Sequence, residues 1–304
     1  MTKSISRRSV LTTSVAATAG LTLPAWATAP MLGAASAKFN RFKLGSYEVT
    51  NLLVGTRQVE DPQTIFGMNV SKAEFDAASE AALIPNDKVR FFFTPTVVNT
   101  GEALILFDAG LSAEATTEAL AEAGYTPDMV DHVVITHMHG DHIGGLLDGS
   151  APTYANAAYH TGAVEFDAWS KADNVLFDTN MKPLAEKTTM MDDGASAFSG
   201  HTAMAAFGHT PGHMVHMIEN DGHALLITAD LANHYVWSLA HPDWEVKFDI
   251  DKEAAAKTRR RVLGMLAADK IPFTGYHMPW PSTGFVQTKG DGFHYVPSSY
   301  QMNL

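Results

Sequence analysis

The sequence contains no cysteine, so a disulfide bond, a thiolate metal ligand and a cysteine nucleophile are all excluded. It is also short of basic residues: 21 lysines and arginines stand against 33 aspartates and glutamates, a formal net charge of −12. Such an acidic protein has no electrostatic reason to bind nucleic acid or an anionic membrane, so we expect neither as a partner. Apolar runs long enough to span a bilayer are missing as well. The 304 residues are nevertheless enough to bury a core that folds without covalent cross-links.

Residues 1–29 have the composition of a cleaved export signal rather than of a folded segment. A basic start with Arg7 and Arg8 precedes an apolar run over 10–23, and an A-x-A cleavage pattern follows within 24–27. The surroundings of the two arginines resemble the twin-arginine export motif, which implies a periplasmic or secreted protein. An ordinary secretory signal with a chance arginine pair is the alternative.

Residues 38–304 contain neither a linker-like stretch nor an internal repeat, so we expect one catalytic domain there. Strand and helix patterns follow each other along it, which is typical of an α/β sandwich. The expected strands lie within 39–59 and over 96–99, 103–107, 133–135, 154–160, 215–219, 224–228 and 273–277, and the expected helices span 71–82, 112–123, 163–171, 178–191 and 252–269. Arg259, Arg260 and Arg261 in the last helix are expected to form a solvated face.

Four metal-binding side chains lie within six residues, directly after an apolar strand. His137, His139 and His142 are imidazoles and Asp141 is a carboxylate, and both groups are good ligands for zinc and similar ions. In an extended segment His137 and His139 point the same way, whereas Asp141 and His142 follow a glycine turn and reach a second position. One segment can therefore serve two adjacent metals. The alternative is a polar loop with histidines placed by chance.

This H-x-H-x-D-H run resembles the signature of the metallo-β-lactamase superfamily, and further motifs of that family follow in the expected order. The resemblance implies an αββα sandwich, in which Asp108 of an Asp-x-Gly turn orients a ligand histidine. A simple turn aspartate is the alternative for Asp108. The resemblance also implies that His213, the last histidine of a Gly-His-Thr-Pro-Gly-His run, binds metal, while His209 is structural or supports a ligand from outside. Asp230 is implied as the ligand that bridges both metals, and His277 as the last ligand.

A binuclear hydrolase with two divalent metal ions, which we expect to be zinc, follows from the resemblance. One metal is expected to be held by His137, His139 and His213, the other by Asp141, His142 and His277, with Asp230 between them. A hydroxide that bridges the metals attacks the substrate, and Asp141 and Asp230 are the catalytic residues that help to place it. A histidine at position 139, where redox di-iron relatives carry glutamate, favours hydrolysis over electron transfer.

Within the superfamily, the chain resembles methyl parathion hydrolase and related exported lactonases and arylesterases. The stretches that carry this resemblance are 136–145, 165–169, 208–213 and the tail 292–300. They imply neutral lactones, aryl esters or organophosphate triesters as substrates, and a homodimer as the assembly. An acyl-homoserine lactone lactonase and a metal-binding relative without turnover are the alternatives. The bridging aspartate argues against a β-lactamase.

The substrate pocket is expected to be apolar, as pockets for small molecules are. No cluster of lysine or arginine stands near the ligand motifs to hold an anionic group, so neutral substrates are expected. Segments 60–90 and 231–250 either line this pocket or are surface insertions. The residues expected to line it are Phe93, Phe166, Trp169 and Trp237.

Overall fold

The computed structural model describes residues 31 and 33–300, so the expected signal over 1–29 lies outside the described part of the chain. The helices and strands that it describes all belong to the compact unit Ala37–Leu304. None of the described helices is long and apolar enough to cross a membrane.

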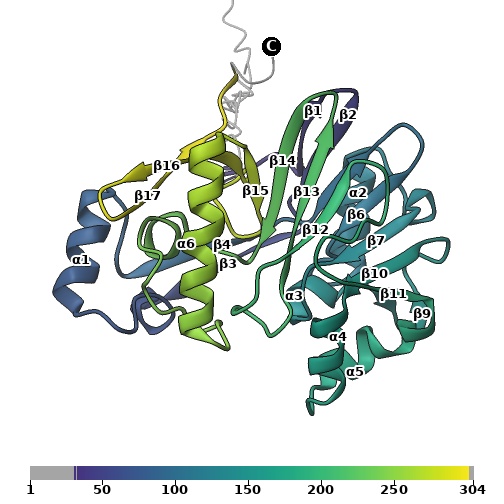
Figure 1. Cartoon of the computed structure of the whole chain (residues 1–304), viewed down its shortest axis with the longest axis horizontal. Coiled ribbons are helices and arrows are strands. Elements are labelled where there is room, and N and C mark those ends of the chain that lie inside the picture. Colours follow the sequence, from purple (N-terminus) through teal and green to yellow (C-terminus); the bar gives the residue numbers. More distant parts are fainter. Residues whose placement is uncertain (1–30, 32, 301–304) are drawn as a thin grey trace, which may run out of the picture. The chain divides into compact units, whose positions relative to one another are not determined.

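Two mixed β-sheets make up the centre of this unit (Figure 1). In spatial order the first sheet consists of β1 (Phe39–Leu44), β2 (Tyr47–Leu52), β5 (Thr96–Asn99), β6 (Leu104–Phe107), β7 (His132–Ile135), β10 (Ala158–Gly162) and β11 (Thr188–Met191). The second consists of β12 (His201–Ala205), β13 (Met214–Asn220), β14 (His223–Ala229), β15 (Phe273–Gly275), β16 (Thr283–Lys289) and β17 (Gly292–Pro297). Two separate ribbons pair β3 (Gly55–Glu60) with β4 (Lys88–Phe93) and β8 (Leu147–Asp148) with β9 (Ala151–Pro152).

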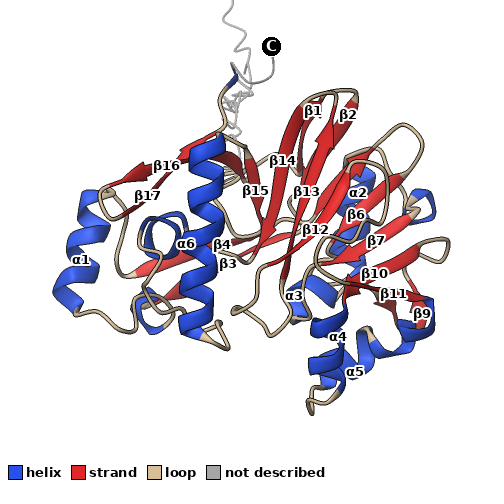
Figure 2. Ribbon diagram, viewed as in Figure 1, coloured by secondary structure: helices blue, strands red, loops and turns tan. Residues whose placement is uncertain are grey.

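Helices cover the outer faces of the sheets (Figure 2). The α-helices are α1 (Lys72–Ala81), α2 (Ala113–Glu122), α3 (Gly140–Ile143), α4 (Ala163–Ser170), α5 (Val175–Asn180) and α6 (Lys252–Asp269). Shorter turns are the 3-10 helices η1 (Pro62–Thr64), η2 (Pro127–Met129) and η3 (Lys182–Lys187) and the π-helical turn η4 (Tyr235–Ala240). Helix α2 begins because the side chain of Ser112 accepts a hydrogen bond from the backbone of Ala115.

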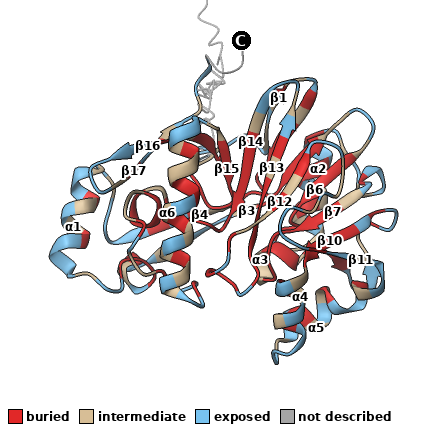
Figure 3. Cartoon of the chain, in the orientation of Figure 1, coloured by how far each residue is buried: buried red, intermediate tan, exposed pale blue. Residues whose placement is uncertain are grey.

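Apolar side chains fill the space between the sheets and the space under the helices. Ile105 and Val134 of the first sheet belong to the same buried cluster as Ile218 of the second. Leu263 of α6 is buried in the cluster on the outer face of the second sheet, and Leu120 of α2 in the one on the first. Figure 3 shows this layering as buried strands and half-exposed helices. The expected αββα sandwich is therefore confirmed.

The topology brings four strand ends with polar residues to one edge. Strands β6 and β7 run parallel in the first sheet, as do β14 and β15 in the second. Asp108 follows β6, His137 follows β7, Asp230 follows β14 and His277 follows β15. Because ligands of α/β proteins bind at the carboxyl ends of parallel strands, this edge is where a functional site is expected.

Two expectations for the middle of the chain are wrong. The strand expected over 154–160 begins only at Ala158, because the carbonyl of Tyr154 accepts hydrogen bonds from the Ala157 N–H and the Tyr159 hydroxyl and closes a turn. The helix expected over 178–191 is replaced by the end of α5, by η3 and by β11. Strand β11 forms instead of helix because its backbone pairs with the free edge of β10.

Candidate metal centre

Two groups of metal-binding side chains lie at this edge, and within each group the donor atoms are no more than 4.8 Å apart. The first group contains His137, His139, His209 and Asp230, and the second contains Asp141, His142 and His277. Asp230 reaches both. Its Oδ2 lies 3.3 Å from Nε2 of His209 and 3.3 Å from Nε2 of His277, and its Oδ1 lies 3.2 Å from Nε2 of His142. This is the position of a carboxylate that can bridge two metals.

Three of these imidazoles are fixed through the ring nitrogen that faces away from the centre. In each, Nδ1–H donates to an oxygen, which leaves Nε2 directed at the carboxylates. The acceptors are Asp108 Oδ2 for His142 (2.8 Å), Asp249 Oδ1 for His209 (2.9 Å) and the Phe92 carbonyl for His277 (2.8 Å). Asp108 therefore holds a ligand histidine in the way that the sequence led us to expect.

Two buried atoms of the centre, Nε2 of His142 and Oδ1 of Asp230, lie 3.2 Å apart, but neither makes a hydrogen bond within the described residues. Buried polar atoms without a partner are costly unless a cation or water binds them. The donors are imidazole nitrogens and carboxylate oxygens, a set that suits zinc and other divalent transition metals. The residues present thus fit two divalent metal ions.

The carboxylates of the centre stabilise protonated imidazoles. Burial opposes a charge on His277 and His209, yet Asp230 and the neighbouring carboxylates raise the pKa of His277 to about 10 and that of His209 to about 9. For His142, burial is outweighed by Asp108, which raises its pKa well above the usual value. A divalent cation competes with these protons for the same nitrogen atoms.

His209 and His213 both border the centre, but only His209 belongs to one of the two donor groups. Nε2 of His209 lies 3.0 Å from Nδ1 of His139, inside the first group. His213 stands outside both groups, because the backbone occupies both of its ring nitrogens. Its Nδ1 donates to the Ala206 carbonyl (3.2 Å), and its Nε2 accepts from the N–H of Asp230 (3.3 Å). His213 therefore contacts the backbone of Asp230, and its role as a ligand stays a prediction, with His209 as a second candidate for that position.

A pair of buried ionic residues, which sequence reasoning missed, holds His209. Asp249 accepts from Nδ1 of His209 (2.9 Å) and from Nη1 of Arg259 (2.7 Å). Arg259 is only 1% exposed and also donates to the carbonyls of Pro242 (2.8 Å) and Trp244 (3.3 Å). The chain from Arg259 through Asp249 to His209 thus links helix α6 to the first donor group.

The expectation of a solvated arginine face on α6 is wrong for Arg259. Arg259 stands four residues before Leu263 and seven before Leu266, both of which are buried, so it shares their face of the helix. Arg260 points elsewhere and pairs with Asp243 at the surface. The spacing of Arg259 from the apolar residues of the helix could have shown that its side chain is buried. The three consecutive arginines obscured that spacing.

Glu165 of α4 joins the two loops that carry the first donor group. Its buried carboxylate accepts from the Met138 N–H (2.9 Å), the Thr210 hydroxyl (2.8 Å) and the Gly212 N–H (2.8 Å). A Cβ on Gly212 would lie 2.1 Å from the backbone nitrogen of Glu165, so only glycine fits there. One carboxylate therefore sets the spacing between the His137–His139 and His209 loops.

Comparison with known proteins decides the family. The model of the metallo-beta-lactamase superfamily matches residues 94–274, more than half of the chain. The chain belongs to this superfamily. Its donor groups, from His137 to Asp230, lie inside the matched region, and His277 follows directly after it.

Two solved structures of similar fold extend over nearly the whole of this metallo-beta-lactamase chain. AidC, described as a dizinc quorum-quenching lactonase in complex with the product N-hexanoyl-L-homoserine, is 27% identical, with a TM-score of 0.80 over 86% of this chain and 98% of its own. The hydrolase AbOPH is 21% identical, with a TM-score of 0.79 over 88% and 99%. At that identity AbOPH shows the fold alone.

Curated relatives match a shorter region. The lactamase-like protein vrtG of Penicillium aethiopicum is 30% identical over 159 residues, which are 47% of this chain and 45% of that protein. The chain thus spans about half the length of the curated relatives it matches. The similarity to lactonases and hydrolases agrees with the resemblance found in the sequence.

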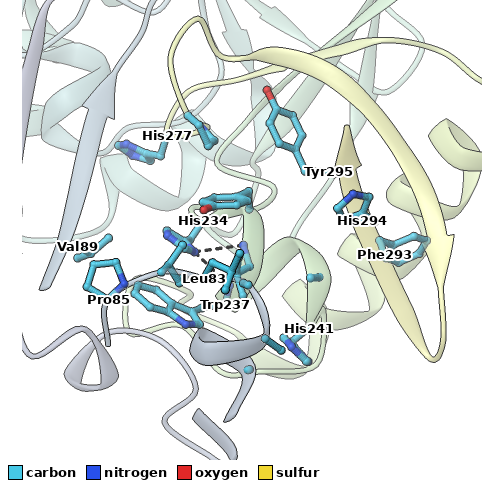
Figure 4. Close-up of a pocket in the computed structure, with 18 of the residues that line it drawn as sticks. Leu83, Pro85, Val89, His234, Trp237, His241, His277, Phe293, His294 and Tyr295 are labelled. Carbon is cyan, nitrogen blue, oxygen red and sulfur yellow. Dashed lines mark hydrogen bonds between the residues drawn. The ribbon is translucent and has the colours of Figure 1, made fainter. Parts of the chain in front are cut away.

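A cavity of about 1030 Å³ opens beside His277 (Figure 4). Residues of 78–92, 234–241 and 289–297 line it, so parts of both segments that the sequence left open, 60–90 and 231–250, contribute to its wall. Trp237 lines it as expected and donates from Nε1 to the Ser79 hydroxyl (2.9 Å).

The other three aromatic residues expected to line the pocket do not do so. Phe93 packs edge-on against His277 at 5.4 Å between ring centroids, and Trp169 packs edge-on against His139 at 5.8 Å. Phe166 packs against Phe177. Phe93 and Trp169 thus contact histidines of the centre, and Phe92, the neighbour of Phe93, lines the cavity instead.

Three basic residues do line the cavity: Lys88, Arg90 and Lys289. They come from β4 and from β16, which are far apart in the sequence. The sequence therefore shows no local cluster of basic residues that would predict them. Their presence removes the argument from which neutral substrates were expected.

Proposed function

We propose that the protein is a hydrolase that uses two divalent metal ions, zinc being the expected metal, to cleave lactones and other small esters. The observation that carries this proposal is Asp230, which is shared by two groups of buried donors. Membership of the metallo-beta-lactamase superfamily and the similarity to the dizinc lactonase AidC support it. AidC also makes acyl-homoserine lactones a specific candidate among the esters.

When bound, the two ions supply Lewis acidity toward a carbonyl oxygen and a nucleophile from water at neutral pH. The chain's own contribution is to hold the donors: Asp108, Asp249 and the Phe92 carbonyl keep Nε2 of three imidazoles aimed inward. The side chain of Asp141 is 23% exposed and that of Asp230 only 4%. Asp141 is thus the carboxylate that meets solvent and an arriving substrate.

The wall of the cavity suits an organic substrate. Val89, Val236 and Trp237 give it apolar surface, and His277 places that surface next to the second donor group. Pockets for small molecules combine such apolar walls with a few polar anchors. A substrate with an apolar part can therefore be held while its ester bond lies at the centre.

The test is a hydrolysis screen with metal-loaded protein. We expect turnover of an aryl lactone, an acyl-homoserine lactone, a p-nitrophenyl ester or a methyl phosphotriester well above that of a cephalosporin or an anionic phosphodiester, with about two metals per chain. Activity should disappear on chelation. Two bound metals without any turnover would point to the metal-binding relative, and a clear preference for the cephalosporin or phosphodiester would overturn the proposal.

Export through the twin-arginine route is a separate proposal, supported by Arg7 and Arg8 in front of an apolar run. Changing both arginines to lysine should leave the precursor in the cytoplasm, as fractionation and immunoblotting would show. Normal delivery of that variant would indicate the general secretory route.

A further inference from the structure

The cavity beside the metal centre has a charge balance opposite to that of the chain. Lys88, Arg90 and Lys289 line it, and no aspartate or glutamate does. In the whole sequence acidic residues outnumber basic ones, 33 to 21. A concave wall of one sign concentrates ligands of the other sign, so this cavity attracts negative charge in a protein that otherwise repels it.

Strand β4 arranges two of these cations in a row that leads to the centre. Side chains alternate along a strand, so Lys88, Arg90 and Phe92 share one face, and all three line the cavity. The row ends at the centre, because the Phe92 carbonyl accepts the hydrogen bond from Nδ1 of His277. With a rise of about 3.3 Å per residue, Arg90 stands about 7 Å and Lys88 about 13 Å along the strand from Phe92.

None of the three cations is engaged by the protein itself. Within residues 33–300, no carboxylate lies within ion-pair distance of Lys88, Arg90 or Lys289, and none of their side chains makes a hydrogen bond. Other lysines do find partners: Lys182 and Lys257 each pair with a carboxylate one helical turn away. The charges in the cavity therefore remain available to a ligand.

The cations approach the cavity from two sides. Figure 4 shows Val89, the neighbour of Lys88 and Arg90, on the side opposite to Phe293 and His294 of β17. Strand β17 pairs with β16, the strand that ends at Lys289. A group held between these walls can meet positive charge from both.

We propose that the enzyme selects esters or lactones that carry a second, anionic group, a carboxylate, separated from the cleaved bond by an apolar linker. The cleaved carbonyl lies at the metal centre, the linker passes the apolar wall at Trp237, and the carboxylate meets Arg90, with Lys88 and Lys289 farther out. This inference rests on the proposed hydrolase function and specifies its substrate class. It replaces the expectation of neutral substrates.

The experiment compares two esters that differ only at the far end: mono-4-nitrophenyl adipate, which ends in a carboxylate, and 4-nitrophenyl hexanoate, which ends in a methyl group. For the metal-loaded enzyme we expect kcat/KM to be about ten-fold higher for the adipate ester, since each of the three exposed charges contributes about a two-fold effect. The preference should shrink as salt is added, because exposed charges are screened.

Variants then assign the effect to the cavity. Arg90→Gln, Lys88→Gln and Lys289→Gln should each lower the adipate-to-hexanoate ratio about two-fold, and the triple variant should bring it close to one. Lys187→Gln is the matched control, because Lys187 is exposed and does not line the cavity. The ratio should not change in this control.

The outcomes separate the two claims. If the hexanoate ester is cleaved but the adipate ester is not preferred, or if the triple variant keeps the preference, the anionic substrate class is overturned and the hydrolase function stands. If a protein that holds both metals cleaves neither ester nor any lactone, the hydrolase function fails and the substrate class fails with it.

Discussion

Replacing Arg259 by methionine should destabilise the protein far more than an ordinary arginine substitution on a helix. The change removes a guanidinium that is 1% exposed and leaves the buried carboxylate of Asp249 without its cation. It also leaves the carbonyls of Pro242 and Trp244 without their donors. Removing one partner of a buried ion pair costs about 3–5 kcal/mol, because the other charge remains buried.

Arg260→Met is the matched control, since Arg260 is the next residue of the same helix and pairs with Asp243 at the surface. Exposed pairs contribute about 0–1 kcal/mol. In a domain of this size about 1 kcal/mol shifts Tm by about 2–4 °C. Arg259→Met should therefore melt at least about 6 °C below the wild type, and Arg260→Met within about 4 °C of it.

Thermal unfolding followed by circular dichroism measures both shifts, and chelator competition measures metal binding. Loss of Arg259 should also weaken the metal held by the first donor group by about 10–100-fold, because Asp249 no longer holds His209 firmly. If Arg259→Met does not fold, Asp249→Asn is the alternative variant. It keeps the size of the side chain, removes its charge, and tests the contact between residue 249 and His209 through the metal affinity. Equal melting temperatures for the two arginine variants would refute the structural role of Arg259.

Three further outcomes follow from the centre and the core. Asp230→Ala should lose both metals and His277→Ala mainly one, as metal analysis would show; two metals in Asp230→Ala would exclude it as the bridge. His209→Gln should lose one metal whereas His213→Gln should retain two, and the reverse result would restore the order expected from the sequence. Burial lowers the pKa of His201 from 6.5 to about 4. Between these pH values His201 is protonated in the unfolded state but not in the folded state, so the free energy of unfolding falls by up to about 3 kcal/mol as the pH drops from 6.5 to 4. His201→Asn should flatten the decline of Tm in chelator-treated protein between these pH values, and an unchanged slope would contradict the assignment.

Much of the metal centre was predictable because its residues follow strands closely. His137, His139, Asp141 and His142 come within a few residues of the end of β7, so local spacing places them together. The sandwich was predictable for a similar reason, since its strands and helices alternate with clear turns between them. Features that depend only on contacts within a short segment can therefore be predicted from the sequence of that segment.

The choice between His209 and His213 could not be made from spacing. Both flank Thr210-Pro211-Gly212, and the decision depends on backbone groups that come from elsewhere. The Ala206 carbonyl and the Asp230 N–H occupy the ring of His213, and Asp249 turns the ring of His209 toward the centre. These are contacts between distant segments, which no local pattern reveals.

The cavity was missed for the same physical reason. Lys88 and Arg90 stand on β4 and Lys289 at the end of β16, and only the folded chain brings them to one wall. The aromatic residues near the ligand motifs were more conspicuous in the sequence. Phe93 and Trp169 nevertheless face ligand histidines, since buried aromatic rings pack where the core needs volume.

Apart from His277, which belongs to both, the centre and the cavity wall are carried by different parts of the chain. Glu165 ties the ligand loops to each other and Asp249 ties His209 to α6, whereas the wall consists mainly of α1, β4, η4 and the β16–β17 hairpin. Mutations in these outer segments can exchange lysines, arginines or apolar residues without moving a single ligand. During evolution such a protein can change its substrate specificity through substitutions at a few positions of the cavity wall while the residues of its metal centre stay the same. Two members of the family with superimposable metal centres can therefore act on different substrates, and the residues of the cavity wall determine the difference.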